Sequence, residues 1–186
     1  MSQYTIAVVP GSLRRESFNK RLARAVIKLL PAEFTAHTID ISALPLYNQD
    51  QDGDPPAAAR QMKEAVAAAQ GVLFVTPEYN RSIPGVLKNA IDHGSRPAGQ
   101  SVWAGKPAGI VGISPGPMGT SMAQQHLRNV LAHLDMRVLG QPEVFLQARE
   151  GFLTADDSIG IDSLAFMTKW VTRYTEWVRQ HAPGRA

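Results

Sequence analysis

Three short segments of the chain carry residues that could do chemistry. The first, residues 11–19, places Ser12, Arg14, Ser17 and Asn19 between an apolar, β-branched run and a helical pattern. Free N–H groups and the positive end of a helix dipole attract anions at such a junction. Two hydroxyls, an amide and a guanidinium supply the neutral and charged donors that a phosphate dianion needs. The segment predicts a phosphate site, although a polar turn with a serine helix cap would use some of the same residues.

The kind of phosphate is limited by what this segment lacks. No Gly-Lys-Ser/Thr follows it, which argues against the Walker A loop of nucleoside triphosphate sites. Gly11 stands alone rather than in a G-x-G-x-x-G pattern, which argues against a dinucleotide pyrophosphate. A terminal monophosphate fits better, because several sides of it can be wrapped by donors.

The second and third segments are suited to a flat ring. In residues 77–85 two prolines stiffen the chain, Tyr79 offers an aromatic face, and main-chain N–H groups around Asn80 offer donors. A flat heteroaromatic ring is bound by stacking on a face and by polar contacts along its edge. Residues 114–121 form a small loop, and its glycines allow main chain to approach a ligand closely.

The elements that must position these segments alternate between strand and helix. Continuous apolar runs predict strands at residues 4–9, 38–41, 72–76, 109–114 and 138–144, the last interrupted by Pro142. Helical spacing predicts helices at residues 17–30, 54–70, 83–92, 123–134 and 163–178. Apolar strands without alternation are typical of a parallel sheet covered on both faces. We expect a doubly wound α/β fold of five parallel strands in the order 2-1-3-4-5, with ligands bound beyond the carboxyl ends of strands one and three.

Composition limits the class of protein further. The chain has 186 residues, 44% of them hydrophobic, which predicts a single domain over residues 1–186. Cysteine is absent, so disulfides, thiolate metal sites and cysteine nucleophiles are excluded. The net charge of +3 comes from scattered residues, which argues against a nucleic-acid partner. We expect no metal site, no membrane span and a cytoplasmic location, because we find no leader peptide and no apolar run of membrane length.

Three motifs carry a resemblance to a known family. They are GSLRRESFN at residues 11–19, TPEYN at residues 76–80 and PGVLKNAID at residues 84–92. With them the chain resembles the NAD(P)H-dependent FMN reductase family, in its chromate and quinone reductase branch. The resemblance implies a flavodoxin-like fold that holds one FMN without a covalent link.

The resemblance also implies a role for each site residue. The phosphate would be wrapped by Ser12, Leu13, Arg14, Arg15, Glu16, Ser17, Phe18 and Asn19, with Arg14 as the charged member. The isoalloxazine would be lined, mostly by main-chain groups, by Pro77, Glu78, Tyr79 and Asn80, and met from its other side by Ser114 and Gly116. Relatives often have two glycines where this chain has Gly119-Thr120, and tyrosine where it has Arg81. No side chain is expected to act as a catalytic acid or base.

The implied activity is a ping-pong oxidoreductase. NADPH or NADH would pass a hydride to FMN, and a quinone, azo dye, chromate or free flavin would then take the electrons. A homodimer or homotetramer is implied, with Arg128 and Glu143 as candidate contacts between subunits. The residues of the last helix form a wide apolar band that would suit such an interface or a thick core helix.

Two alternatives remain open at this stage. A flavodoxin-like electron carrier, or a flavin-binding regulator without turnover, would share the fold. A serine hydrolase with Ser114 as nucleophile is suggested by a G-x-S-x-G match at residues 112–116. The match is weak, because Pro115 has no N–H group to form an oxyanion hole.

Overall fold

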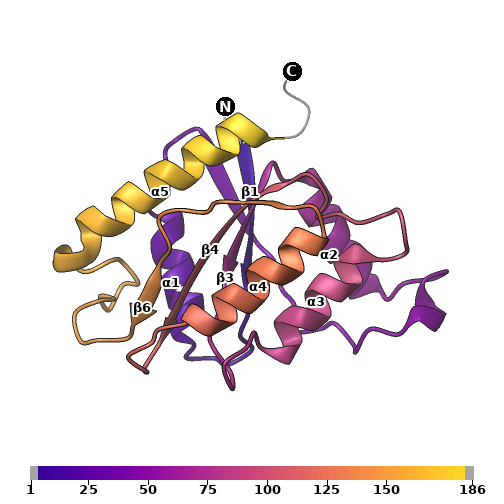
Figure 1. Ribbon diagram of the computed structural model, residues 1–186, viewed down its shortest axis with the longest axis horizontal. Helices are drawn as coiled ribbons and strands as arrows, with labels where there is room; N and C mark the ends of the chain where they lie inside the picture. The colour runs from indigo at the N-terminus through magenta and orange to yellow at the C-terminus, as the bar shows by residue number, and fades with distance from the viewer. Residues whose placement is uncertain (1–3, 183–186) are drawn as a thin grey trace.

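The computed structural model describes residues 4–182, which form a parallel sheet between two layers of helices (Figure 1). The strands are β1 (Tyr4–Pro10), β2 (Phe34–Thr38), β3 (Gly71–Val75), β4 (Pro107–Ser114), β5 (Arg137–Val138) and β6 (Phe145–Gln147). The helices are α1 (Phe18–Ile27), α2 (Ala57–Ala68), α3 (Gly85–Ser95), α4 (Ser121–His133) and α5 (Ile161–His181), with a short 3-10 turn η1 (Gln49–Gln51). The strand order is β2-β1-β3-β4-β5, and β6 also pairs with β4. The predicted flavodoxin-like α/β fold is confirmed.

Alternate residues of the strands pack on opposite faces of the sheet. In β1, Ile6 and Val8 join a core with side chains of α1 and α5, whereas Ala7 and Val9 join a core with α2, α3 and α4. Figure 1 shows the same division, with α1 and α5 on one side of the sheet. Both faces are therefore buried, which is why these strands are apolar without alternation.

Two predicted strands were misplaced. The second strand was expected at residues 38–41 but is Phe34–Thr38, and Ile39 and Ile41 are buried against the α2 side of the sheet beyond its end. The fifth was expected as one strand over residues 138–144. It is instead two short strands, since β5 pairs with the start of β4, β6 pairs with its end, and Pro142 lies between them without an N–H to donate.

Most of the apolar band of the last helix belongs to the core, although Phe166 is 46% exposed. Met167, Trp170, Tyr174 and Val178 of α5 are all buried, and the rings of Trp170 and Tyr174 stack with centroids 5.4 Å apart. Gly109 of β4 leaves room for them, because a Cβ there would lie 2.6 Å from Cδ2 of Tyr174. This packing favours the core-helix interpretation. Within residues 4–182 no helix is both long and apolar enough to cross a membrane.

Candidate functional site

The structure brings the three predicted segments to one edge of the sheet. Loop 1 (residues 11–17) follows β1, loop 2 (residues 76–84) follows β3, and loop 3 (residues 115–120) follows β4. Since β1, β3 and β4 are neighbours and parallel, their carboxyl ends meet at the edge where α/β sheets bind ligands.

Loop 1 presents donors that no protein group uses. Ser12 and Ser17 are buried, at 4% exposure each. Ser17 caps α1, and its hydroxyl oxygen accepts a hydrogen bond from the N–H of Lys20 at 3.4 Å, which leaves its own proton free to donate. In the described chain, neither the Ser12 hydroxyl nor the main-chain N–H groups of residues 12–16 donate to any acceptor. Such a loop can bind an anion, because hydroxyl and N–H donors without a protein acceptor gather at the N-terminus of α1.

Loop 1 carries two arginines and one glutamate, Glu16, and neither arginine has a carboxylate partner among residues 4–182. The Arg14 guanidinium lies 5.5 Å from the centre of the Phe18 ring and donates to the carbonyl of Glu16. Lys20, which the motif did not single out, also belongs here, since its ammonium group donates to the carbonyl of Leu13 at 3.2 Å.

Asn19 has a different task from the one expected. Its amide was predicted to donate to the phosphate, but it is 2% exposed and bound to the main chain of β4. Its Nδ2 donates to the carbonyl of Ile113 at 2.8 Å, and its Oδ1 accepts from the N–H of Ile113 at 3.1 Å. The side chain therefore fixes the start of α1 to β4 and positions loop 1.

The tip of loop 2 is a tight two-residue turn. Tyr79 and Ser82 exchange two main-chain hydrogen bonds of 2.9 and 3.0 Å, and the residues between them, Asn80 and Arg81, have φ angles of 51° and 63°. Positive φ is unusual for side chains other than glycine and asparagine, and such strain gathers at functional sites. Tyr79 remains 50% exposed, so its ring is free to contact a ligand.

Glu78 ties loop 2 to the neighbouring helix. Its Oε2 accepts hydrogen bonds from the N–H groups of Met122 and Ala123 in the first turn of α4, each at 3.0 Å. No side chain at Thr120 caps this helix, so Glu78 provides the negative charge that its N-terminus favours. The carboxylate is therefore directed to α4, and only the main chain of Glu78 is available to line a ring.

Loop 3 has no hydrolytic machinery. The hydroxyl of Ser114 donates to the carbonyl of Gly119, and no described histidine bonds to it. His181 lies near the end of α5, with its ring 4.0 Å from that of Trp177. The serine hydrolase alternative is wrong for these reasons. A Cβ at Gly116 would lie 3.8 Å from the Ser114 hydroxyl oxygen, whereas Gly119 has a φ of 59° and packs against the main chain of β6.

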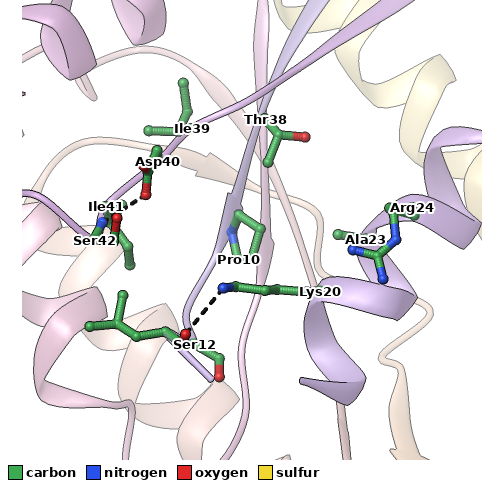
Figure 2. A pocket seen from close by; sticks show the side chains of 11 residues that line it. Pro10, Ser12, Lys20, Ala23, Arg24, Thr38, Ile39, Asp40, Ile41 and Ser42 are labelled. Carbon is green, nitrogen blue, oxygen red and sulfur yellow. Dashed lines mark hydrogen bonds between the residues drawn. The ribbon is translucent and has the colours of Figure 1, made fainter. Parts of the chain in front are cut away.

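A cavity of about 430 Å³ lies on the β2 side of loop 1 (Figure 2). Ser12, Leu13 and Lys20 form one wall, and residues 38–42 form another. Hydrogen bonds from Ser42 lower the pKa of Asp40 in this wall, with a smaller contribution from the charge of Lys20. No residue of loops 2 or 3 lines this cavity, so we do not assign it to the ring.

Arg128 and Glu143, expected to contact another subunit, contact each other in this chain. The Arg128 Nε lies 3.3 Å from Oε1 of Glu143, and Nη1 donates to the carbonyl of Leu139 at 2.9 Å. Burial lowers the pKa of Arg128, and the charge of Glu143 opposes this effect. A role between subunits stays a prediction.

Residues 4–150 match the family model described as NADPH-dependent FMN reductase. The chain belongs to this family. Among curated relatives of this FMN reductase, a 2-hydroxy-1,4-benzoquinone reductase of a Burkholderia species is 51% identical over 175 residues, 94% of this chain and 96% of the relative. A quinone reductase of Pseudomonas putida is 42% identical over 181 residues, 96% of this chain and 97% of the relative. The solved structure of FerB, a flavoenzyme NAD(P)H:(acceptor) oxidoreductase from Paracoccus denitrificans, has a TM-score of 0.92 and 38% identity and covers 96% of this chain and 99% of that one.

The residues of this edge fit FMN. A ribityl monophosphate needs a loop with free hydroxyl and N–H donors and positive charge, which is what residues 12–17 supply. The ring needs main-chain donors beside an aromatic face, which loop 2 supplies through the turn at Asn80 and the exposed Tyr79. Family membership and the donor set therefore point to the same cofactor.

Proposed function

We propose that this chain is an NAD(P)H-dependent, FMN-containing oxidoreductase that reduces quinones. The observation that carries the proposal is loop 1, in which the hydroxyl of Ser12 and a run of main-chain N–H groups have no protein acceptor. The reductase names of relatives at 42–51% identity favour turnover over the alternative of a non-catalytic electron carrier.

The chain's own residues bind and orient, and no side chain is assigned proton transfer. Ser12, Ser17 and Arg14, with the N–H groups of loop 1, would hold the phosphate. Pro77, Tyr79, Asn80 and the main chain of Glu78 would line one side of the ring, with Ser114 and Gly116 on the other. Bound FMN supplies the redox chemistry, in which NAD(P)H loses a hydride and a quinone gains two electrons and two protons to become a hydroquinone.

The finer features of the activity remain part of the proposal. Transfer would be ping-pong, with both substrates using one exposed face of the ring in turn. Azo dyes, chromate and free flavin are further candidate acceptors. A cytoplasmic homodimer or homotetramer, without nucleic acid or membrane partners, completes the proposal.

Steady-state kinetics of the purified, FMN-loaded protein test this function. We expect NADPH oxidation that depends on a quinone, needs bound FMN and gives parallel double-reciprocal plots. Loaded protein that oxidises neither NADPH nor NADH with any quinone would contradict the proposal. Turnover with intersecting plots would leave the reductase assignment in place and remove the ping-pong order.

A further inference from the structure

The cavity beside loop 1 lies in line with the proposed flavin site. Because the strands run in the order β2-β1-β3-β4, the carboxyl edge of the sheet presents this cavity first, then loop 1, loop 2 and loop 3. With its ring at loops 2 and 3 and its phosphate in loop 1, FMN would end where the cavity begins, since Ser12 and Leu13 line the cavity as well. A cofactor that continued beyond this phosphate would enter the cavity.

Two groups of opposite charge line the cavity and do not pair with each other. Lys20 reaches into it from α1, and Asp40 lies on the opposite wall, on the chain after β2 (Figure 2). Neither of them forms an ion pair with any residue of the described chain. Both are held in place, because the Lys20 ammonium donates to the carbonyl of Leu13 at 3.2 Å and hydrogen bonds from Ser42, one of them from its N–H at 2.8 Å, hold the Asp40 carboxylate.

This pair of charges selects a ligand that carries both an anion and hydroxyl donors. A free anion fits poorly, because Asp40 repels it while Lys20 attracts it. A nucleoside phosphate satisfies both groups, since its phosphate accepts from the ammonium and its ribose hydroxyls donate to the carboxylate. In dinucleotide sites of α/β sheets, an acidic residue beyond the first βα turn accepts such a hydrogen bond from a ribose hydroxyl. Arg24, the other charged residue of the lining, is already paired with Asp157 at 2.6 Å.

The remaining walls suit a flat base. Pro10, Ile39 and Ile41 contribute apolar surface to the lining. The volume of about 430 Å³ lies in the range of cavities that hold small ligands, which bind flat rings between apolar walls with a few polar groups at the edge. The cavity therefore has a surface for each part of a nucleotide: base, ribose and phosphate.

We propose that this cavity binds the adenosine monophosphate half of FAD, so that the flavin-free protein takes up FAD as well as FMN. The inference rests on the phosphate site of the proposed function. Loop 1 would hold the phosphate next to the ribityl chain, Lys20 the second phosphate and Asp40 the ribose hydroxyls. Because loop 1 lacks the G-x-G-x-x-G pattern, the second phosphate depends on the side chain of Lys20 and not on a glycine-rich main chain.

Calorimetric titration of the flavin-free protein with FMN and with FAD tests the proposal without turnover. We expect wild type to bind FAD with a Kd within about tenfold of that for FMN. Asp40→Ala should weaken FAD binding about tenfold, through the loss of a hydrogen bond to a charged group, and leave FMN binding within about twofold. Asp40→Asn should lose less. The matched control is Asp50→Ala, because Asp50 is an exposed acid of η1 that does not line this cavity, and both Kd values should stay unchanged.

The outcomes separate this proposal from the proposed function. Wild type that binds FMN but binds FAD more than tenfold more weakly would overturn the proposal and leave the function in place, whereas wild type that binds neither flavin would refute the phosphate site itself. Unchanged or tighter FAD binding by Asp40→Ala would also overturn the proposal, because the carboxylate would then only repel phosphate, and so would equal losses for both flavins, which would show a structural effect.

The reductant is the other source of an adenosine group, and kinetics of the FMN-loaded variant distinguish it. We expect Asp40→Ala to keep its KM for NADH and for NADPH within about twofold of wild type. A raised KM for either reductant, with FAD binding unchanged, would assign the cavity to the adenosine of NAD(P)H and overturn the proposal.

Discussion

The hydroxyl group of Ser12 provides the sharpest test of the phosphate site. The residue is 4% exposed, and nothing in residues 4–182 accepts the proton of its hydroxyl. We expect Ser12→Ala to change two properties in opposite directions. The FMN-free protein should keep or gain stability, because an unpaired polar group is removed, and FMN binding should weaken, because a donor to the phosphate is lost.

The size of each effect follows from the burial of Ser12. An unpaired buried polar group costs roughly 1–3 kcal/mol, and the remaining access of water limits the gain here to about 1 kcal/mol. For a chain of this size, such a gain raises Tm by roughly 2–4 °C. A hydrogen bond to a charged group contributes roughly 1.5–3 kcal/mol, so FMN binding should weaken roughly tenfold to a hundredfold.

Arg14→Ala is the matched comparison within the same loop. The guanidinium is exposed, so its pairing with a phosphate is screened by solvent and contributes about 1 kcal/mol, or roughly a fivefold change in Kd. Added salt should shrink the effect of Arg14→Ala, because screening weakens exposed charge pairs, and should leave the effect of Ser12→Ala nearly unchanged.

Two measurements on each variant test whether loop 1 binds the phosphate. Thermal unfolding with and without FMN gives the stability of the free protein and the gain on binding, and quenching of FMN fluorescence gives the Kd. A Ser12→Ala protein that melts several degrees lower without FMN, yet binds FMN as tightly as wild type, would show that the hydroxyl is structural. The assignment of loop 1 to the phosphate would then fail.

Three further changes test how the site is held. Glu78→Gln should lower stability by about 1 kcal/mol in chemical denaturation, because α4 loses a full negative charge at its N-terminus, and should weaken FMN binding; unchanged values of both would contradict the role given to this carboxylate. Gly119→Ala should destabilise the protein by about 1–2 kcal/mol, since φ is 59° and a Cβ would lie 2.8 Å from the main-chain carbon of Phe145; a wild-type Tm would refute this. Asp157→Asn should lower stability by about 1 kcal/mol or less at neutral pH, since Arg21 and Arg24 lose an ion-pair partner that stays partly exposed. The hydrogen bond from Arg21 lowers the pKa of Asp157, so the extra stability of wild type over Asp157→Asn should disappear as pH falls below about 4. A stability difference between the two proteins that persists in strong acid would contradict this role of Asp157.

The strand order could be predicted because the central strands are buried on both faces. Continuous apolar runs at β1, β3 and β4 leave few alternatives to a parallel sheet. The edge strand β2 could not be located in this way, because only Phe34 of its five residues is buried. The apolar residues that attracted the prediction, Ile39 and Ile41, lie past the end of β2 in the core cluster that includes Met62 and Val66 of α2, although the N–H of Ile39 still donates to the carbonyl of Val8 at 2.8 Å.

The three segments that form the site could also be predicted from the sequence. The contacts that individual side chains make within them could not. Asn19 and Glu78 both read as ligand-binding residues in their motifs. Their partners are Ile113, 94 positions away, and Met122, 44 positions away. No local sequence pattern predicts such distant contacts. An amide or a carboxylate looks the same in the sequence whether it bonds to a ligand or to a remote stretch of main chain.

These distant contacts explain how short polar loops can present free main-chain donors. Each loop is fixed by one side-chain contact to a distant part of the fold. Asn19 joins the start of α1 to β4, Glu78 joins loop 2 to α4, and Gln147 of β6 donates to the carbonyl of Pro115 in loop 3 at 3.1 Å. Because side chains do the fixing, main-chain N–H groups remain available for the ligand. Substitution of a fixing residue must therefore lower FMN affinity and the stability of the free protein together. Substitution of a donor such as Ser12 must lower FMN affinity without lowering the stability of the free protein, so stability and affinity measured together separate the two kinds of residue.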